Sequence, residues 1–326
     1  MQHHIVVADG YTLNPGDLSW KSLEKFGRVD VFPRSSREKF AERAKNATLL
    51  IVNKQPINAE VLASLPKVRC ICASATGYNN IDVEACAKLG IPVCNVVGYG
   101  STSVAQHVFA MLLTVCNRVQ LHHNSVQQGD WARSADWCYW NQPLIELAGQ
   151  TMGIYGLGKI GQQVARIAQG FEMKVLATHK HPERDAMEGV QFVDFETLCR
   201  QSDVISLNAP LNESNRGLIN QQTLGWMKNT AILINTGRGG LIVEEDLREA
   251  LLQGEIAAAC LDVLSQEPPP HDHPLIGLKN CIVTPHQAWA ARASRQRLLD
   301  AVIKNVAAFV EGNPTNVVNP NYKTQA

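Results

Sequence analysis

The sequence predicts an α/β fold made of two domains, each built on a parallel sheet. The chain has 326 residues, which is long for a single core and suits two domains of ordinary size. Short apolar runs alternate with helical patterns throughout, as in chains built from β-α-β units. A third observation is the glycine pattern G-x-G-x-x-G at residues 156–161, which lies between an apolar run and a helical pattern. Together these observations favour a small parallel sheet first and a Rossmann-type dinucleotide-binding domain after it.

The first hundred residues contain five candidate strands, at 5–8, 29–32, 48–52, 69–72 and 93–96. We expect them to form a flavodoxin-like sheet. Residues 101–118 then predict one long helix, with Ser101 and Ser103 as candidate N-caps and apolar residues at helical spacing. This helix would carry the chain out of the first domain.

Residues 120–148 differ from their surroundings, because they hold Trp131, Trp137, Tyr139 and Trp140 among polar residues without a clean period. Such a segment suits a dimerisation arm, and a surface loop that packs on its own domain is the alternative. A second α/β block follows, with candidate strands at 152–155, 174–178, 204–207, 231–235, 257–261 and 281–284. A last amphipathic helix is predicted at 294–310.

Charge and composition exclude several classes of partner. The 30 Lys and Arg residues balance the 30 Asp and Glu residues, so nothing indicates a nucleic-acid footprint or an anionic membrane surface. The longest apolar stretches, such as 108–115, are much shorter than the roughly 20 residues that span a bilayer. The N-terminus lacks the pattern of a signal peptide. We therefore expect a cytoplasmic protein whose partner is a small molecule.

The sequence predicts no metal site. Its nine cysteines lie mostly inside apolar runs, and no Cys-x-x-Cys pair occurs, which favours buried free thiols. Histidine pairs occur at 3/4, 122/123, 179/181 and 271/273, but none has a helical i, i+4 partner or a nearby cysteine.

The glycine pattern predicts a cofactor site. Gly156 would allow a tight turn, Gly158 would let a pyrophosphate approach the backbone, and Gly161 would let helix and strand pack closely. The N-terminus of the following helix would then face the phosphates. A merely structural glycine turn is the alternative.

The end of the next strand bears on the choice between NAD and NADP. An acidic residue that binds the adenosine ribose of NAD is usual there, and this chain has Thr178, His179 and Lys180 instead. Lys180, with help from His179 and Thr178, could meet the extra phosphate of NADP, and Arg184 is a weaker candidate. We favour NADP on this ground, and the alternative is NAD with Lys180 in solvent.

Three residues that follow strands predict the chemistry. In an open α/β sheet, ligands bind outside the carboxyl ends of the strands. Arg238, between glycines, suits a bidentate carboxylate clamp. His286 could act as the acid that protonates a carbonyl oxygen, and Glu267 could favour the protonated form of that histidine. Reduction of a 2-oxo acid by hydride needs this set.

At this point the chain resembles the D-isomer-specific 2-hydroxyacid dehydrogenase family over nearly its whole length. The matching motifs are Ala75-Thr76-Gly77-Tyr78-Asn79-Asn80-Ile81-Asp82, the glycine pattern at 156–161, Asn235-Thr236-Gly237-Arg238-Gly239, Leu261-Asp262-Val263 with Glu267-Pro268, and Thr284-Pro285-His286. The resemblance implies that Arg238, Glu267 and His286 form the catalytic set. It also implies that Asp262 binds the nicotinamide amide and that backbone N–H groups of Ala75, Thr76 and Gly77 bind the substrate carboxylate.

Further cofactor contacts follow from the resemblance. They are expected at Gly156, Leu157, Gly158, Lys159, Ile160, Ala209, Pro210, Thr236, Gly237 and His286. Asn208 departs from the family pattern, in which a histidine is common at this position. The missing acidic ribose ligand is a second departure, and it looks more like the NADP-using members.

The resemblance also implies a domain order. The cofactor domain, 101–286, would be inserted into a substrate domain made of 1–100 and 287–326, and the protein would be a homodimer. The segments 9–15 and 136–140 look most like the branch of glycerate dehydrogenases and hydroxypyruvate reductases. The alternatives are a dehydrogenase for another 2-hydroxy acid and a non-catalytic NAD-sensing protein of the corepressor type, which shares the fold.

Overall fold

The computed structural model of the chain describes residues 3–325. The chain divides into two compact units, Met1–Gly100 with Ala290–Ala326, and Ser101–Trp289. The chain first passes from one unit to the other between residues 100 and 101, the boundary that the sequence predicts. The second passage falls between 289 and 290, three residues later than the sequence predicted, so that Gln287, Ala288 and Trp289 belong with the second unit.

Unit 1 is built on a five-stranded parallel sheet. Its strands are β1 (His3–Val7), β2 (Gly27–Val31), β3 (Leu49–Val52), β4 (Cys70–Ala73) and β5 (Val93–Cys94), in the order β2-β1-β3-β4-β5. This is the flavodoxin-like strand order that the sequence predicts. The helical segments are η1 (Lys21–Phe26), α1 (Arg37–Ala44), α2 (Ala59–Ala63), α3 (Val83–Lys88), α11 (Arg292–Val310) and η4 (Pro320–Gln325).

The two faces of this sheet are covered by different helices. On one face, Val6, Leu50 and Ile71 form a core cluster with residues of α1, α2 and α3, such as Phe40 and Leu62. The alternating residues of the same strands point the other way, because side chains alternate along a strand. On that face α11 contacts β4, and its buried residues include Leu298 and Val302. The C-terminal helix therefore completes the first unit.

Unit 2 is built on a seven-stranded parallel sheet. Its strands are β6 (Thr151–Tyr155), β7 (Lys174–Thr178), β8 (Val190–Phe192), β9 (Val204–Leu207), β10 (Ile232–Asn235), β11 (Ala258–Leu261) and β12 (Cys281–Val283). The order is β12-β11-β10-β9-β6-β7-β8, with its reversal between β6 and β9. Such a reversal is the point of an open α/β sheet where ligands bind.

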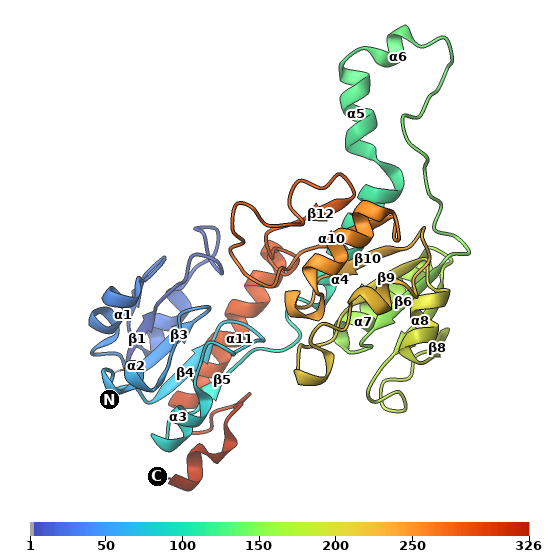
Figure 1. The fold of residues 1–326 in the computed structure, drawn as a ribbon. Helices are drawn as coiled ribbons and strands as arrows, with labels where there is room; N and C mark the ends of the chain where they lie inside the picture. Colours follow the sequence, from blue (N-terminus) through green and yellow to red (C-terminus); the bar gives the residue numbers. More distant parts are fainter. Residues whose placement is uncertain (1–2, 326) are drawn as a thin grey trace. The chain divides into compact units, whose positions relative to one another are not determined.

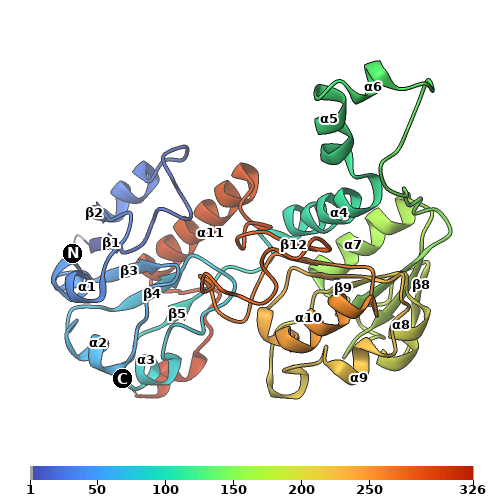
Figure 2. The same ribbon diagram turned by 45° about the horizontal axis from the view of Figure 1, so that its top comes forward.

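Helices cover both faces of the second sheet (Figure 2). They are α4 (Ser101–Asn117), α7 (Lys159–Gly170), α8 (Phe195–Gln201), α9 (Gln221–Leu224) and α10 (Glu244–Gln253), with η2 (Glu213–Asn215) and η3 (Gly239–Leu241) in the loops. One core cluster joins α4 and α7 to the sheet, and the second joins α8, α9 and α10 to the opposite face. Ser101 and Ser103 lie inside α4 and are not its N-caps, and the Ser103 hydroxyl donates to the carbonyl of Ala288 at 2.7 Å.

The segment after α4 projects from unit 2 (Figure 1). It contains two helices, α5 (Val119–Gln127) and α6 (Asp130–Arg133), where the sequence showed no clean period. The reason is that these helices bury almost nothing, since Ser125 is the buried residue of α5 and α6 has none. The side chains of Trp131, Trp137 and Trp140 are 53%, 86% and 65% exposed.

None of the helices between residues 3 and 325 is both long and apolar enough to cross a membrane.

Candidate active site

The turn between β6 and α7 needs its glycines for three different reasons. Gly156 has φ +95°, a backbone conformation that side chains other than hydrogen disfavour, and a Cβ there would lie 2.8 Å from the backbone nitrogen of Ala209. A Cβ on Gly161 would lie 2.2 Å from the Gly156 oxygen, so only glycine lets the helix pack this closely. A Cβ on Gly158 would meet no atom within 4 Å. The space beside Gly158 is therefore open to a ligand.

Backbone N–H groups at this turn are suited to an anion. Within the described residues, the N–H groups of Gly158, Lys159 and Ile160, at the start of α7, donate to no acceptor. Those of Gly156 and Leu157 donate instead to the Thr178 carbonyl (2.9 Å) and to the His179 ring (3.1 Å). A helix N-terminus with unpaired N–H groups binds phosphate well. The residues present thus fit the pyrophosphate of a dinucleotide.

The three residues at the end of β7 have separate environments. The Thr178 hydroxyl donates to the Val193 carbonyl at 2.9 Å. The His179 ring turns towards the glycine turn, and its Nε2 lies 2.6 Å from a carboxylate oxygen of Asp185. Only Lys180 of the three is exposed. Lys180 is therefore the one of these three predicted phosphate-binding residues whose side chain faces solvent.

Asp185 is a carboxylate that the sequence analysis did not single out. It lies in the loop after β7, five residues beyond Lys180 and outside any strand, so periodicity offered no signal for it. The Arg184 guanidinium, and after it the His179 ring, lower the pKa of Asp185 to about 2. An acidic group therefore lies near the end of β7 after all, but it is already paired within the protein.

Two buried polar atoms near the carboxyl ends of β9 and β10 lack a partner. Among the residues described, the Oδ1 atom of Asn208 and the Oγ1 atom of Thr236 are buried without a hydrogen bond. A buried polar atom without a partner is costly, and a bound ligand can satisfy it. Ala209 and Pro210, which were also expected to touch the cofactor, follow Asn208, and Ala209 borders Gly156. These orphaned atoms lie beside the predicted dinucleotide site and fit its presence.

His286 and Glu267 meet directly. The Nδ1 atom of His286 lies 2.6 Å from Oε2 of Glu267, and Oε1 of Glu267 accepts from the N–H of Leu264 at 3.1 Å. Their side chains are 29% and 36% exposed, so both are reachable from solvent. An ionised carboxylate only accepts hydrogen bonds, so it keeps a proton on Nδ1 and leaves Nε2 for a substrate.

The backbone at His286 is unusual. Its φ is +51°, in the left-handed region that residues with a side chain rarely adopt. Its N–H donates to the carbonyls of Asp262 (2.8 Å) and Thr284 (3.0 Å). Outliers of this kind persist where the surroundings hold them, and they gather at functional sites.

Asp262 holds the loop that carries His286. It is 1% exposed, and its carboxylate accepts from the Thr284 hydroxyl (2.6 Å) and from the N–H groups of Gln287 (2.9 Å) and Ala288 (2.8 Å). The His107 ring on α4 lies 3.0 Å from the Thr284 hydroxyl. His107 could not be predicted from the sequence, because it lies in an apolar helical segment and belongs to no motif. The expected contact of Asp262 with a nicotinamide amide stays a prediction.

Arg238 follows β10 and is exposed. Its Nη1 atom donates to the Gly237 carbonyl at 2.8 Å, and no acidic side chain among residues 3–325 forms an ion pair with it. Gly239, next to it, is required by close packing, since a Cβ there would lie 2.0 Å from the carbonyl carbon of Leu264. The guanidinium is therefore available to an anion from outside the protein.

The predicted carboxylate loop, Ala75 to Gly77, belongs to unit 1. The Val96 N–H donates to the Ala75 carbonyl (3.1 Å), and the Asn95 side chain donates to the Thr76 carbonyl (2.8 Å). The Thr76 hydroxyl donates to the Val96 carbonyl (2.7 Å). The N–H groups of Ala75, Thr76 and Gly77 donate to no acceptor among the described residues. Such a row of N–H groups suits an anion.

A second part of unit 1 is organised around Asp9. Its carboxylate accepts from the N–H groups of Asn53 (2.7 Å), Lys54 (2.6 Å) and Gln55 (2.8 Å). The Asn53 amide in turn donates to the carbonyl of Ser74, next to the predicted carboxylate loop, at 2.7 Å. The two loops are thus linked within one unit.

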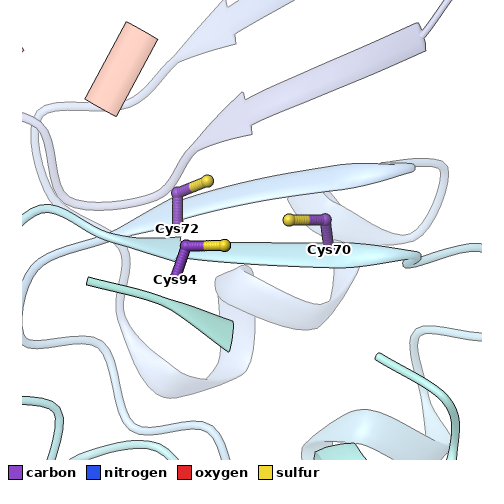
Figure 3. A group of neighbouring side chains, drawn as sticks. All are labelled: Cys70, Cys72 and Cys94. Atoms are coloured by element: carbon purple, nitrogen blue, oxygen red, sulfur yellow. The ribbon is translucent and has the colours of Figure 1, made fainter. Parts of the chain in front are cut away.

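Three cysteines of unit 1 converge on one point (Figure 3). The sulfur atoms of Cys70, Cys72 and Cys94 lie within 4.8 Å of one another, and all three residues are buried. Hydrogen bonds with the other two thiols, and then burial, raise the pKa of the Cys70 thiol well above its ordinary value. Hydrogen bonds with Cys70 and Cys72 lower the pKa of the Cys94 thiol to about 4. The cluster lies on the neighbouring strands β4 and β5, in the interior of unit 1.

Comparisons with known proteins agree with this geometry. A family model for the NAD binding domain of D-isomer specific 2-hydroxyacid dehydrogenases matches residues 109–288. The chain is 46% identical over 320 residues to a hydroxypyruvate reductase of Blautia hydrogenotrophica, covering 97% of this chain and 99% of that one. It is 41% identical over 311 residues to a glycerate dehydrogenase of Methylorubrum extorquens, covering 92% and 97%.

Solved structures show the same two-unit architecture. An acyclic imino acid reductase in complex with NADPH and D-Arg superposes with a TM-score of 0.83 at 30% identity, covering 97% of this chain and 99% of that one. A D-2-hydroxyisocaproate dehydrogenase, at 23% identity, shares the fold with a TM-score of 0.84, covering 97% and 99%.

Proposed function

Because the chain belongs to the D-isomer specific 2-hydroxyacid dehydrogenase family, and is thus an oxidoreductase that transfers a hydride between 2-hydroxy and 2-oxo acids, we propose that its substrate pair is D-glycerate and hydroxypyruvate. The two relatives described above are a hydroxypyruvate reductase and a glycerate dehydrogenase, which supports this pair. Glyoxylate is a second substrate that we expect, since a relative from Korarchaeum cryptofilum, 38% identical over 291 residues, is a glyoxylate reductase. These relatives are all named for enzyme activities, which favours an enzyme over the corepressor alternative.

Arg238, Glu267 and His286, which follow β10, β11 and β12, have different roles towards the substrate. Arg238 binds the substrate carboxylate with its planar fork. His286 donates a proton from Nε2 to the carbonyl oxygen during reduction and takes it back during oxidation. Glu267 keeps the ring oriented and stabilises its charged form through the 2.6 Å contact with Nδ1. The observation that carries this assignment is the His286–Glu267 contact on a backbone held in a left-handed conformation.

Two backbone sites bind the anionic ends of the ligands. In unit 1, the N–H groups of Ala75, Thr76 and Gly77 form a site that suits a carboxylate. In unit 2, those of Gly158, Lys159 and Ile160 bind the pyrophosphate of the cofactor. The cofactor supplies the hydride when it is bound.

The cofactor we propose is NADP in preference to NAD. The support is that β7 ends in Thr178-His179-Lys180 without a carboxylate, and that Lys180 is exposed where a 2′-phosphate would need a cation. The carboxylate of Asp185, which would repel that phosphate, is paired with Arg184 at 2.6 Å. No metal takes part in the proposed chemistry.

The arm that contains α5 and α6 is the proposed dimer contact. Its tryptophans are exposed, and a second copy of the chain would cover them, in keeping with the aromatic character of protein interfaces. We expect Trp137→Ala to raise the concentration at which dimers dissociate in analytical ultracentrifugation. An unchanged monomer–dimer equilibrium would argue against the contact.

The nine cysteines of the chain are all free thiols. A reducing compartment preserves such thiols, so we propose that the protein acts in the cytoplasm.

The test of the function is a set of initial rates with NADH and NADPH in parallel against hydroxypyruvate, glyoxylate and pyruvate. We expect hydroxypyruvate to be reduced fastest and NADPH to be preferred. His286→Ala should lower turnover by about a hundred-fold or more while cofactor binding persists. His271→Ala, at an exposed histidine, is the matched control and should keep full activity. Failure to reduce any of the three acids would refute the proposed substrate class.

A further inference from the structure

The His179 ring forms a hydrogen bond with the glycine turn of its own protein. The N–H of Leu157, inside the glycine turn, donates to the Nδ1 atom of this ring at 3.1 Å. On the other side, Nε2 lies 2.6 Å from Oδ2 of Asp185. The side chain is only 11% exposed. The ring therefore lies between the turn and an acidic residue of the next loop.

This contact fixes the protonation state of the ring. A backbone N–H only donates, so Nδ1 must offer its lone pair and carry no proton. The single proton of the neutral ring is then on Nε2, where it points at the Asp185 carboxylate. A doubly protonated imidazolium has no lone pair on either nitrogen and could not accept from Leu157. His179 in this arrangement is uncharged, so it offers no cation to a phosphate.

Asp185 holds the tautomer in place. Its Oδ2 atom also accepts from Arg184, whose Nη2 and Nε lie at 2.6 and 3.1 Å. The guanidinium and the His179 ring lower the pKa of this carboxyl to about 2, so it stays ionised and accepts only. His181 is the other titratable ring nearby, edge-on with its centroid 6.3 Å from that of His179. The Asp185 carboxylate that faces Nε2 is thus an acceptor over the whole pH range in which enzymes work.

The hydrogen bond to His179 helps to hold the glycine turn against the end of β7. The N–H of Gly156 donates to the Thr178 carbonyl (2.9 Å), and the next N–H along the chain, that of Leu157, donates to His179. Two successive peptides are in this way tied to the end of β7. Among the residues described, the next three N–H groups, those of Gly158, Lys159 and Ile160, donate to no acceptor and stay available to the predicted pyrophosphate.

We propose that His179 is a positioning residue for the cofactor, which as a neutral ring locks the glycine turn through the Leu157 N–H, with Asp185 selecting the tautomer. This inference rests on the proposed dinucleotide site. It assigns His179 to the shape of the pyrophosphate site and leaves the recognition of a 2′-phosphate to other residues. Because β7 lies on the far side of β6 and β9 from the strands that carry Arg238, Glu267 and His286, its effect is on cofactor binding and not on proton transfer.

Two amide substitutions separate the two ring nitrogens. In His179→Asn the side-chain oxygen lies as many bonds from Cα as Nδ1 does, so it can still accept from Leu157. In His179→Gln the amide reaches the position of Nε2, so it keeps the partner Asp185 and loses the acceptor for Leu157. We expect His179→Gln to raise the KM and the Kd of the cofactor about five- to ten-fold, the size of one backbone hydrogen bond, with kcat within two-fold of wild type. His179→Asn should stay within about two-fold in both constants.

The measurement is a fluorescence titration of NADH and NADPH together with initial rates, and the melting temperature of each variant reports on its fold. Equal loss in both variants, or a loss that appears in kcat and not in the KM of the cofactor, would overturn the positioning role. Wild-type protein is titrated first. If it binds neither NADH nor NADPH, the dinucleotide site itself fails and the inference with it; if it binds and the two variants do not differ, only the inference fails.

Discussion

Replacing Glu267 by Gln tests the proton-transfer pair most directly. Oε1 of Glu267 accepts from the Leu264 N–H and Oε2 from the His286 ring, so both oxygens face donors. An amide has one oxygen and one NH2 group, and one of these two donors must then face the NH2. The substitution keeps the volume of the side chain and removes both a charge and an acceptor.

The size of the effect follows from exposure. A hydrogen bond to a charged group contributes about 1.5–3 kcal/mol, and screening reduces this for a pair whose side chains are 29% and 36% exposed. We take about 1–2 kcal/mol, which corresponds to a loss of about five- to thirty-fold in kcat/KM for reduction of the oxo acid at neutral pH.

The direction of the reaction gives the sign. Reduction needs a proton on the ring, and the carboxylate favours that form, so the substitution should lower kcat/KM for reduction more than kcat/KM for oxidation, which starts from the neutral ring. The assay is kcat/KM in both directions, with Glu245→Gln, at an exposed glutamate of α10, as the control. A Glu267→Gln enzyme with normal rates in both directions would refute the reasoning.

Four further substitutions address the ligands and the glycine turn. Arg238→Lys should raise the KM for the oxo acid about ten-fold or more in steady-state rates, because a point charge cannot reproduce the bidentate fork, and an unchanged KM would exclude the clamp. Lys180→Ala should raise the KM for NADPH about five- to ten-fold and leave NADH nearly unchanged, whereas equal effects would leave Lys180 in solvent. Gly161→Ala should destabilise the fold by about 1–3 kcal/mol, seen as a lower melting temperature, since its Cβ would lie 2.2 Å from a backbone oxygen. Gly158→Ala, which meets no atom within 4 Å, should keep the melting temperature and weaken cofactor binding, and a large drop in stability there would contradict the open space beside it.

Most strands could be predicted from the sequence, because a parallel strand covered on both faces is a continuous apolar run. β7 (Lys174–Thr178) and β9 (Val204–Leu207) agree with their predicted bounds. β8 (Val190–Phe192) was not predicted, since this edge strand has three residues, none of them buried. The helices of the arm were missed for the same physical reason: without a buried face, a helix leaves no period in the sequence.

The candidate site shows where sequence reasoning stops. Arg238, Glu267 and His286 could be predicted, because each lies in a motif that follows a predicted parallel strand. The partners that orient them are separated by loops of no regular period, so nothing in the sequence paired His179 with Asp185 or the Thr284 hydroxyl with His107. Which ring nitrogen faces which partner depends on distances of a few ångströms, and those exist only in the folded chain.

Asp262 holds the loop that carries His286, and it is also the residue expected to bind the nicotinamide amide. A residue such as His286 in the left-handed region costs about 1–3 kcal/mol, and the surrounding contacts must offset this strain. The loop at 284–288 is held by the Asp262 carbonyl and by its carboxylate, which already accepts three hydrogen bonds, two of them on Oδ1. A carboxylate has about four lone-pair sites, so one remains, on Oδ2. The family resemblance implies that Asp262 binds the nicotinamide amide, and in that case this one residue would link the orientation of the cofactor to that of the proton donor.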